Sequence, residues 1–230
     1  MINAFDADIL DYLNQFAQHS RGFDTIVAAL SSQALLKGWV LVCLFWWVWF
    51  DQGEDNAANR ETIIATCIAA VLAVAAGRLL ANYLPFRVRP LQSPELAFVL
   101  PYGVAPDALR SWSSFPSDHA MVFFAMSAGL WYVSKTLGAA VSVYVAIVIA
   151  LPRIYLGFHY PSDIIGGAVL GVLFAVAANW APVKHRLAAP ALRWVHAHPA
   201  SFYATFVLFS QGLATLFDAV RHLTPLWRSP

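Results

Sequence analysis

Long apolar segments alternate with short polar ones along this 230-residue chain. A bilayer core of roughly 30 Å requires about 20 apolar residues in a helix, and six segments reach or approach that length. The third of them is short before Lys135, so its helix is expected to begin further upstream, near Ser117. The pattern predicts an all-α integral membrane protein, a bundle of six transmembrane helices. The six segments lie at about 27–50, 62–84, 119–135, 138–158, 161–181 and 200–218.

The N-terminal part of the chain has a different pattern. Residues 5–20 place apolar side chains at helical spacing among acidic ones, which is typical of an amphipathic helix lying in the membrane interface. The first long segment follows, with Lys37 as its only charge and an aromatic belt at residues 45–50. No internal repeat or linker separates parts of the chain, so residues 1–230 are expected to form a single domain.

The composition agrees with a membrane environment. Hydrophobic residues make up 60% of the chain and charged residues 12%, and the mean hydropathy is +0.61, outside the range of soluble globular proteins. The formal net charge of only +1 provides no basic field for nucleic acid. We therefore expect membrane lipids as the surroundings and no nucleic acid partner, while the oligomeric state stays open.

The connections between the segments indicate an orientation. Residues 182–199 carry three basic side chains, and the connection after the third segment carries Lys135. Six alternating spans place both on one side, which the positive-inside rule makes cytoplasmic. The acidic connection at 51–61 falls on that side too, a mild conflict, since acidic residues weigh little in this rule. The expected protein is a multi-pass inner (plasma) membrane protein with its polar cluster facing the periplasm or exterior.

Two of the three polar segments at the ends of the apolar runs could bind phosphate. Arg87 and Arg89 follow the second run, and guanidinium groups match phosphate oxygens, although juxtamembrane arginines also contact lipid headgroups. Ser117 and His119 lie where the third run starts, so free helix-start amides and a hydroxyl could hold an anion while His119 protonates a leaving oxygen. A plain helix cap is the alternative interpretation of this second segment.

The third polar segment has the most specific spacing. Arg153, His159 and Asp163 are separated by six and then four positions, and a helix start at Pro161 lets Asp163 reach back to His159. A carboxylate that accepts the Nδ1–H of a histidine fixes its tautomer and leaves Nε2 free as a nucleophile. A structural His–Asp pair at a helix cap is the alternative.

Together the three segments resemble the type 2 phosphatidic acid phosphatase superfamily. Its signature reads Lys-x6-Arg-Pro, Pro-Ser-Gly-His and Ser-Arg-x5-His-x3-Asp. The order of the three parts relative to the apolar runs agrees as well, and the resemblance covers about residues 62–181. The matching positions are Arg89-Pro90, Pro116-Ser117-Asp118-His119, and Arg153 with His159 and Asp163.

Three positions depart from that signature. Asn82 stands where the lysine is expected, Pro152 replaces the serine, and Asp118 replaces the glycine. Arg78, one helical turn before Asn82, or Arg87, nearer the loop, could supply the missing charge, and we favour Arg78. The Phe-Pro-Ser-Asp-His sequence and the small size are also similar to the bacterial undecaprenyl pyrophosphate phosphatase branch.

The resemblance implies a membrane lipid phosphatase that works through a phosphohistidine. His159 would attack phosphorus with Asp163 orienting it, and His119 would protonate the leaving group and then activate water. Arg89, Arg153 and Ser117 would hold the phosphate oxygens, so no metal or other cofactor is expected.

The substrate is less defined than the reaction. Undecaprenyl pyrophosphate is the leading candidate. Phosphatidylglycerol phosphate, phosphatidic acid and a lipid A phosphate are alternatives, since each is an amphiphile whose phosphate reaches water. A non-catalytic lipid-binding or transport protein is the alternative of another class.

Overall fold

The structure, a computed structural model, describes residues 2–53 and 55–217. All regular structure within these residues is helical, which confirms the predicted all-α class. A short 3₁₀ turn, η2 (Pro90–Gln92), and two π-helical segments, η1 (Leu35–Trp39) and η3 (Val145–Ala150), interrupt the α-helices. The α-helices are α1 (Ala4–Asn14), α2 (Arg21–Ser32), α3 (Val40–Phe50), α4 (Asn56–Tyr83), α5 (Asp118–Val133), α6 (Lys135–Tyr144), α7 (Leu151–Tyr155), α8 (Pro161–Asn179), α9 (Ala181–Ala197) and α10 (Pro199–Ala214).

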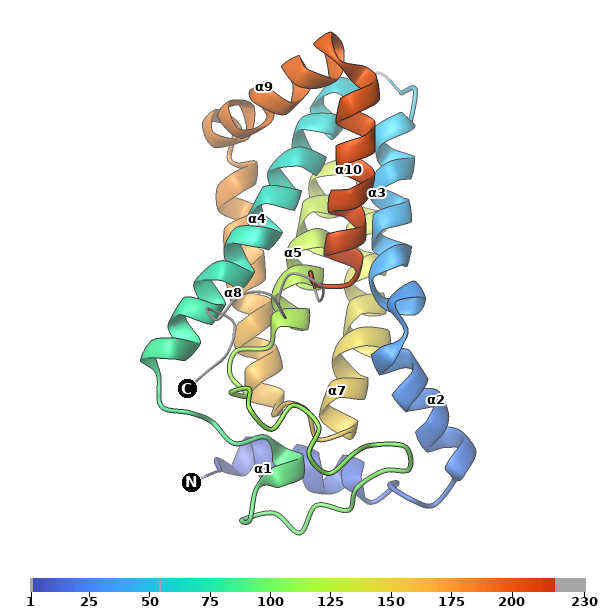
Figure 1. Ribbon diagram of the computed structural model, residues 1–230, viewed down its shortest axis with the longest axis vertical. Helices are drawn as coiled ribbons and strands as arrows, with labels where there is room; N and C mark the ends of the chain where they lie inside the picture. The colour runs from blue at the N-terminus through green and yellow to red at the C-terminus, as the bar shows by residue number, and fades with distance from the viewer. Residues whose placement is uncertain (1, 54, 218–230) are drawn as a thin grey trace.

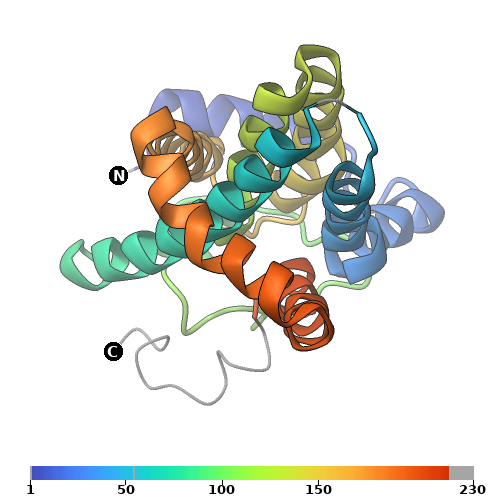
Figure 2. The ribbon, with the colours of Figure 1, turned by 90° about the horizontal axis from the view of Figure 1, so that it is seen from above.

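The centre of the bundle is formed by α4, α5 and α8, which pack against one another (Figures 1 and 2). Glycines allow α5 and α8 to approach closely. A Cβ added at Gly171 would collide with the backbone of Met121, and one at Gly167 would lie 2.6 Å from the carbonyl oxygen of Ser117. Small residues at a helix contact are typical of membrane bundles. The contact joins the start of α5 to the start of α8, where the Ser117 amide donates to the Asp163 carbonyl at 3.2 Å.

Several of the predicted apolar segments form helices long enough to cross a bilayer. Three described helices meet that length and hydropathy, and a fourth does so if a bent pair is taken as one span. The three are Asn56–Tyr83, Lys135–Tyr155 and Pro161–Asn179. Helices α5 and α10 have 16 residues each. Six spans therefore stay a prediction, and the end of the sixth segment, at residue 218, lies outside the described residues.

The first predicted apolar segment, at about 27–50, is bent and is not one continuous helix. Arg21–Ser32 and Leu35–Phe50 meet at an angle of 65°. Gln33, between them, has an extended ψ of 113°. The break follows the polar run that starts at Ser31, whose hydroxyl accepts from Arg153 Nη1 at 3.4 Å. The Ser31 side chain thus contacts the buried Arg153 instead of lipid. The bend also brings η1 close to Arg153.

Helix α1 runs across one end of the bundle (Figure 1). Its Leu10 is buried, whereas Phe5 and Tyr12 are exposed. The helix ends at Asn14, earlier than the predicted boundary at residue 20. Its position in a membrane interface stays a prediction.

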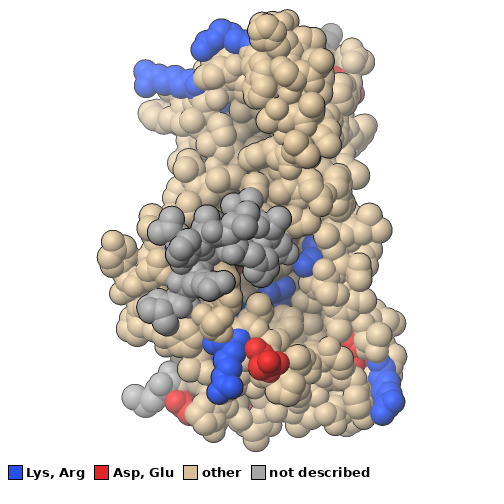
Figure 3. Space-filling view, in the orientation of Figure 1, with Lys and Arg blue, Asp and Glu red and all other residues tan. Residues whose placement is uncertain are grey.

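Charged side chains lie near both ends of the face of the molecule that Figure 3 shows. Basic side chains project from α9 at the end opposite α1, and a broad uncharged band separates them from the charged groups nearer α1 (Figures 1 and 3). The α9 residues are Lys184, Arg186 and Arg193. An uncharged belt between two charged ends is the surface expected of a membrane protein.

Candidate active site

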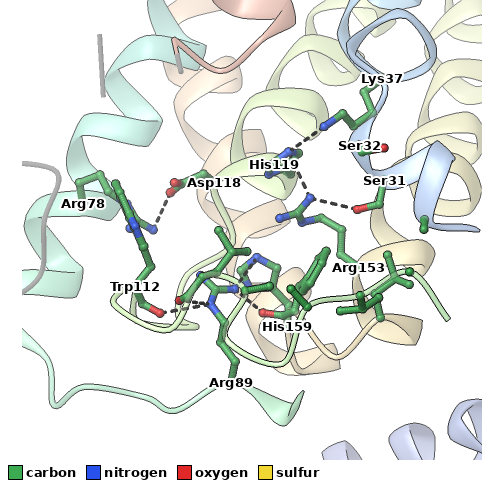
Figure 4. A pocket seen from close by; sticks show the side chains of 18 residues that line it. Ser31, Ser32, Lys37, Arg78, Arg89, Trp112, Asp118, His119, Arg153 and His159 are labelled. Atoms are coloured by element: carbon green, nitrogen blue, oxygen red, sulfur yellow. Dashed lines mark hydrogen bonds and ion pairs between the residues drawn. The ribbon is translucent and has the colours of Figure 1, made fainter. Parts of the chain in front are cut away.

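A cavity of about 510 Å³ opens near the α1 end of the bundle. Both histidines and three of the arginines predicted for the site line it, so the structure brings those five side chains together (Figure 4). They come from the end of α4, the loop 84–117, α5, α7 and the turn before α8. The described ionisable side chains that line the cavity are Lys37, Arg78, Arg89, Asp118, His119, Arg153 and His159.

His159 is held in one orientation by the backbone. It follows a turn at Gly157, whose φ of +70° is readily adopted only by glycine. The ring Nδ1 lies 2.8 Å from the carbonyl oxygen of Ser114 and therefore donates its hydrogen to it. The other nitrogen, Nε2, lies 3.4 Å from Arg89 Nη1, on the cavity side. This tautomer places the ring's lone pair on Nε2, as the predicted nucleophilic role requires.

Asp163 supports this arrangement less directly than the spacing predicted. Its Oδ2 lies 3.7 Å from His159 Nδ1, beyond hydrogen-bond distance and farther than the Ser114 carbonyl. The Asp163 carboxylate instead accepts from the Ser114 hydroxyl and from the Tyr160 amide, the latter at 2.8 Å. Ser114 was not among the predicted residues, although a serine pair beside Phe115 was visible in the sequence. Asp163 thus fixes the residue whose carbonyl fixes His159.

The environment of His159 keeps its ring neutral. The residue is 3% exposed, and burial lowers the pKa of its ring from the ordinary 6.5 to about 4, with the nearby Arg89 charge adding to the effect. A ring in its neutral form carries the lone pair that a nucleophile requires.

His119 lies in the first turn of α5 and faces two cations. Its Nε2 is 3.3 Å from Arg153 Nη1 and 3.5 Å from Lys37 Nζ (Figure 4). Ser117 caps this helix, since its Oγ accepts from the Ala120 amide at 3.4 Å. Ser117 is buried and is not among the lining residues, so its hydroxyl serves the helix rather than the cavity. His119 therefore reaches the cavity from a fixed helix start.

Arg89 and Arg153 are buried cations at the cavity wall. Arg89 is 4% exposed and donates to the carbonyl oxygens of Phe158, Trp112 and Ser113, the last two at 3.2 and 3.3 Å. Burial lowers its pKa to about 10, which leaves it protonated at neutral pH. Arg153 is 5% exposed. Fixed cations of this kind suit the equatorial oxygens of a phosphate.

The candidates for the missing lysine occupy three different places. Arg78 lines the cavity, and its Nη2 lies 2.6 Å from Asp118 Oδ1. Asn82 is exposed on α4 and is not among the lining residues. Arg87 does not line the cavity either. Of the three, the structure brings only Arg78 to the site.

Arg87 instead joins α1 to the start of α8. Its Nη2 lies 2.7 Å from Asp6 Oδ2, and its Nη1 pairs with the Asp163 carboxylate and donates to Ser162 Oγ at 2.9 Å. Asp6 in turn accepts from the Ser162 amide at 2.8 Å. Arg87 is thus placed to orient Asp163 from behind the cavity.

Lys37 is the lining cation that the sequence did not assign to the site. It was recognised there as the lone charge of an apolar segment, and such a charge is costly in a membrane unless it has a function or a partner. The lone charge within an apolar segment is the signal in the sequence that could have identified Lys37 as a site residue. Within the described residues, no three or more His, Cys, Asp or Glu side chains gather in a way that could hold a metal ion.

Comparison with known proteins gives a consistent result. The model of the PAP2 superfamily matches residues 65–187. The chain is 29% identical over 183 residues to the lipid A 1-diphosphate synthase of Escherichia coli K12, covering 74% of this chain and 73% of that protein. It is 22% identical over 166 residues to the undecaprenyl-diphosphatase BcrC of Bacillus subtilis 168, covering 72% and 78%.

A third relative is named as a transport protein and not as an enzyme. The chain is 31% identical over 134 residues to the bacitracin transport permease protein BcrC of Bacillus licheniformis, covering 58% of this chain and 57% of that protein. No solved structure matches the chain.

Proposed function

The chain belongs to the PAP2 superfamily, and from that premise we propose that this membrane phosphatase removes the terminal phosphate of a lipid pyrophosphate through a phosphohistidine, with undecaprenyl pyrophosphate as the leading substrate. The observation that carries the proposal is the cavity itself. His159 Nε2 faces it beside Arg89, while His119 enters from another helix beside Arg153. A nucleophile, an acid and two fixed cations within one cavity are what phosphoryl transfer requires.

In the proposed reaction His159 Nε2 attacks phosphorus in line as the bond to the leaving oxygen breaks. The Ser114 carbonyl takes the hydrogen bond of Nδ1–H throughout and, with Asp163 behind it, stabilises the imidazolium of the phosphohistidine. His119 gives a proton to the departing lipid phosphate. It then removes a proton from water, which cleaves the N–P bond and releases inorganic phosphate. Arg89 and Arg153 bind the equatorial oxygens at each stage.

Charge supports a pyrophosphate as the substrate. Among the described residues, four cationic side chains and one carboxylate line the cavity, so its described lining has three more positive than negative charges. A terminal phosphate carries about 1.5 to 2 negative charges near pH 7, and a pyrophosphate has a further acidic group. The relative in Bacillus subtilis is named for undecaprenyl diphosphate. A cavity with this surplus matches the more highly charged headgroup better than a monophosphate.

The experiment is a phosphate-release panel on purified protein in detergent. Undecaprenyl pyrophosphate, phosphatidylglycerol phosphate, phosphatidic acid and a lipid A phosphate are compared in the presence of EDTA. The proposal expects the highest kcat/KM for undecaprenyl pyrophosphate and inhibition by orthovanadate, which mimics pentacoordinate phosphorus. Preference for a monophosphate would contradict the substrate, and a requirement for an added divalent ion would contradict the role of the arginines. Lipid binding or transport without phosphate release would favour the non-catalytic alternative.

A phosphorylated lipid is a second candidate acceptor of the phosphoryl group, besides water, and the same assay can test it. The similarity to a lipid A 1-diphosphate synthase favours transfer of the phosphoryl group from the phosphohistidine to a phosphorylated lipid in place of water. Adding lipid A to undecaprenyl pyrophosphate with a labelled terminal phosphate distinguishes transfer to a lipid from transfer to water. Label in lipid A indicates transfer, and label in inorganic phosphate indicates hydrolysis.

We further propose six spans, with α1 in the outer interface and the cavity facing the periplasm or exterior. Support comes from the basic residues on α9 at the end opposite α1. Single cysteines at Asp107, in the loop on the cavity side, and at Ala181, at the start of α9, suit a labelling test because both residues are exposed. With Cys43 and Cys67 replaced, an impermeant thiol reagent should label the cysteine at Asp107 in intact cells and not the one at Ala181. The reverse pattern would contradict the orientation.

A further inference from the structure

We propose that Lys37 is a substrate-binding residue of this active site, whose ammonium group binds an oxygen of the scissile phosphate beside His119. The inference rests on the proposed phosphatase function. It adds a charged residue from the first apolar segment to a site whose other described ionisable lining residues lie between positions 78 and 159. It replaces the expectation that Arg78 or Arg87 provides the cation absent at Asn82.

The position of the Lys37 side chain is the first observation. It lines the cavity and points toward His119, with Nζ 3.5 Å from His119 Nε2 (Figure 4). Arg153 Nη1 lies 3.3 Å from the same nitrogen. Two positively charged hydrogen-bond donors therefore lie at His119 Nε2, the atom that the proposed reaction places next to the leaving oxygen.

The distribution of the other charges is the second observation. Arg78 lies 2.6 Å from Asp118 in the cavity wall, so these two charges largely offset each other. Arg87 is engaged by Asp6 and Asp163 behind the cavity. Among the three side chains that could complement Arg89 and Arg153, Lys37 is the one whose charge faces both the cavity and His119.

The backbone that carries Lys37 is the third observation. Lys37 lies in the π-helical η1, and π-helical segments in helices are frequent at functional sites. Its neighbour Gly38 packs so tightly on α10 that a Cβ would collide with the Ala214 backbone. The Tyr144 hydroxyl, from the helix preceding η3, donates to the Leu36 carbonyl. A bend, a glycine contact and a cross-helix hydrogen bond thus combine to hold this one charged residue at the cavity.

These contacts suggest how Lys37 acts when substrate binds. Anionic phosphate oxygens are stronger acceptors than a neutral imidazole nitrogen. A phosphate entering beside His159 would take the hydrogen bonds of Lys37 and Arg153. His119 Nε2 would then be free to take up a proton from solvent and to give it to the leaving oxygen, so the same two cations both bind the phosphate and release the acid.

Kinetics of three variants test the inference. Lys37→Gln should lower kcat/KM about 10- to 100-fold and raise the inhibition constant for orthovanadate by a similar factor, because a charge-assisted hydrogen bond is lost. Lys37→Arg should recover most of both. Lys135→Gln, which removes an exposed lysine at the start of α6, is the matched control and should stay within twofold of the parent.

A chemical measurement on the unaltered protein avoids any folding defect of a variant. The sequence contains three lysines, Lys37, Lys135 and Lys184, so acetylation by an N-hydroxysuccinimide ester can be quantified at each by mass spectrometry. Orthovanadate should protect Lys37 at least several-fold, and should leave the acetylation of the other two unchanged.

The outcomes separate this inference from the proposed function. Phosphate release by the parent, and its loss in His159→Ala, test the phosphatase independently of Lys37. If both hold while Lys37→Gln keeps kcat/KM within twofold, or while vanadate inhibits without protecting Lys37, the inference is wrong and the phosphatase stands. If His159→Ala releases phosphate normally, the proposed function itself is wrong.

Discussion

Two histidine–carboxylate pairs lie at opposite ends of this molecule, and the tighter of them is not the one at the cavity. His185 Nδ1 lies 2.7 Å from Glu61 Oε2 on the surface of α9 and α4, with the two side chains 64% and 20% exposed. His159 and Asp163 are 3.7 Å apart, with side chains 4% and 0% exposed. Distance within the pair therefore does not identify the reactive histidine.

The surroundings of the two rings explain the difference. Solvent screens the His185 pair, and exposed ion pairs of this kind contribute about 0 to 1 kcal/mol. His159 is enclosed, has Nδ1 fixed by a backbone carbonyl, and has a buried arginine beside Nε2. Burial, tautomer and neighbouring charge distinguish the proposed nucleophile, because both ends pair a histidine with a carboxylate.

Replacing the two histidines should give the largest contrast. We expect His159→Ala to lower kcat at least about 10³- to 10⁴-fold, because removal of a nucleophile leaves only the contribution of binding. His185→Ala should stay within twofold. The measurement is phosphate release by purified protein in detergent. Comparable losses in both variants would mean that the α9 end also takes part in catalysis or in folding the site.

Replacing His119, the proposed general acid, should give the second largest loss of activity. His119→Ala is expected to lower kcat about 10²- to 10⁴-fold, the usual contribution of a general acid. The loss should shrink for a synthetic substrate with a good leaving group, which needs no proton. His196→Ala on α9 is the matched control and should have no effect on either substrate. An equal loss with both substrates would mean that protonation of the leaving group is not the role that His119 plays in the rate-limiting step.

Acid should destabilise the protein through His159. Burial lowers the pKa of His159 to about 4, whereas the unfolded ring titrates near 6.5, so below pH 6.5 the unfolded state binds the extra proton. The free energy of unfolding should therefore fall by up to roughly 3 kcal/mol between pH 6.5 and 4. Thermal unfolding as a function of pH measures this, and His159→Gln should flatten the dependence while His185→Gln should not. Parallel pH curves for the parent and His159→Gln would refute the assigned origin.

The smallest expected effect concerns the residues behind the cavity. Arg87→Gln and Asp6→Asn should each destabilise the protein by about 1.5 kcal/mol, because each removes a charge-assisted hydrogen bond of a largely buried network. The double variant should lose less than the sum, since the two residues are partners. Arg193→Gln on α9 controls for loss of charge. Additive losses would contradict the pairing of the two residues, and an Arg87→Gln variant that changes only substrate affinity would place Arg87 at the phosphate instead.

Local signals in the sequence predicted the helix starts of the site. The start of α5 at Ser117 and of α8 at Pro161 follows from capping and proline chemistry, which depend only on neighbouring residues. The grouping of His119, His159, Arg89 and Arg153 followed from a resemblance in motif order and spacing.

The contacts that span the chain could not be predicted in this way. Asp6 and Arg87 are 81 residues apart, and Lys37 and His119 are 82 apart. Such pairings depend on the direction of the bend at Gln33 and on the course of the loop 84–117, which has no periodic pattern. Ser114 acts through its carbonyl, a group that every residue has and that no sequence pattern marks.

The bend before Lys37 also determines how the protein fits its bilayer. A straight helix over the thirty residues Arg21–Phe50 would be about 45 Å long, whereas the stretch Leu35–Phe50 beyond the bend measures about 24 Å. That stretch is shorter than a hydrocarbon core of roughly 30 Å. A span of this length requires local thinning of the bilayer or snorkelling of the residues that flank it, a case of hydrophobic mismatch. We therefore expect the acyl-chain length of the surrounding lipids to affect how deep Lys37 and the cavity lie beneath the headgroups, and so the access of substrate to the cavity.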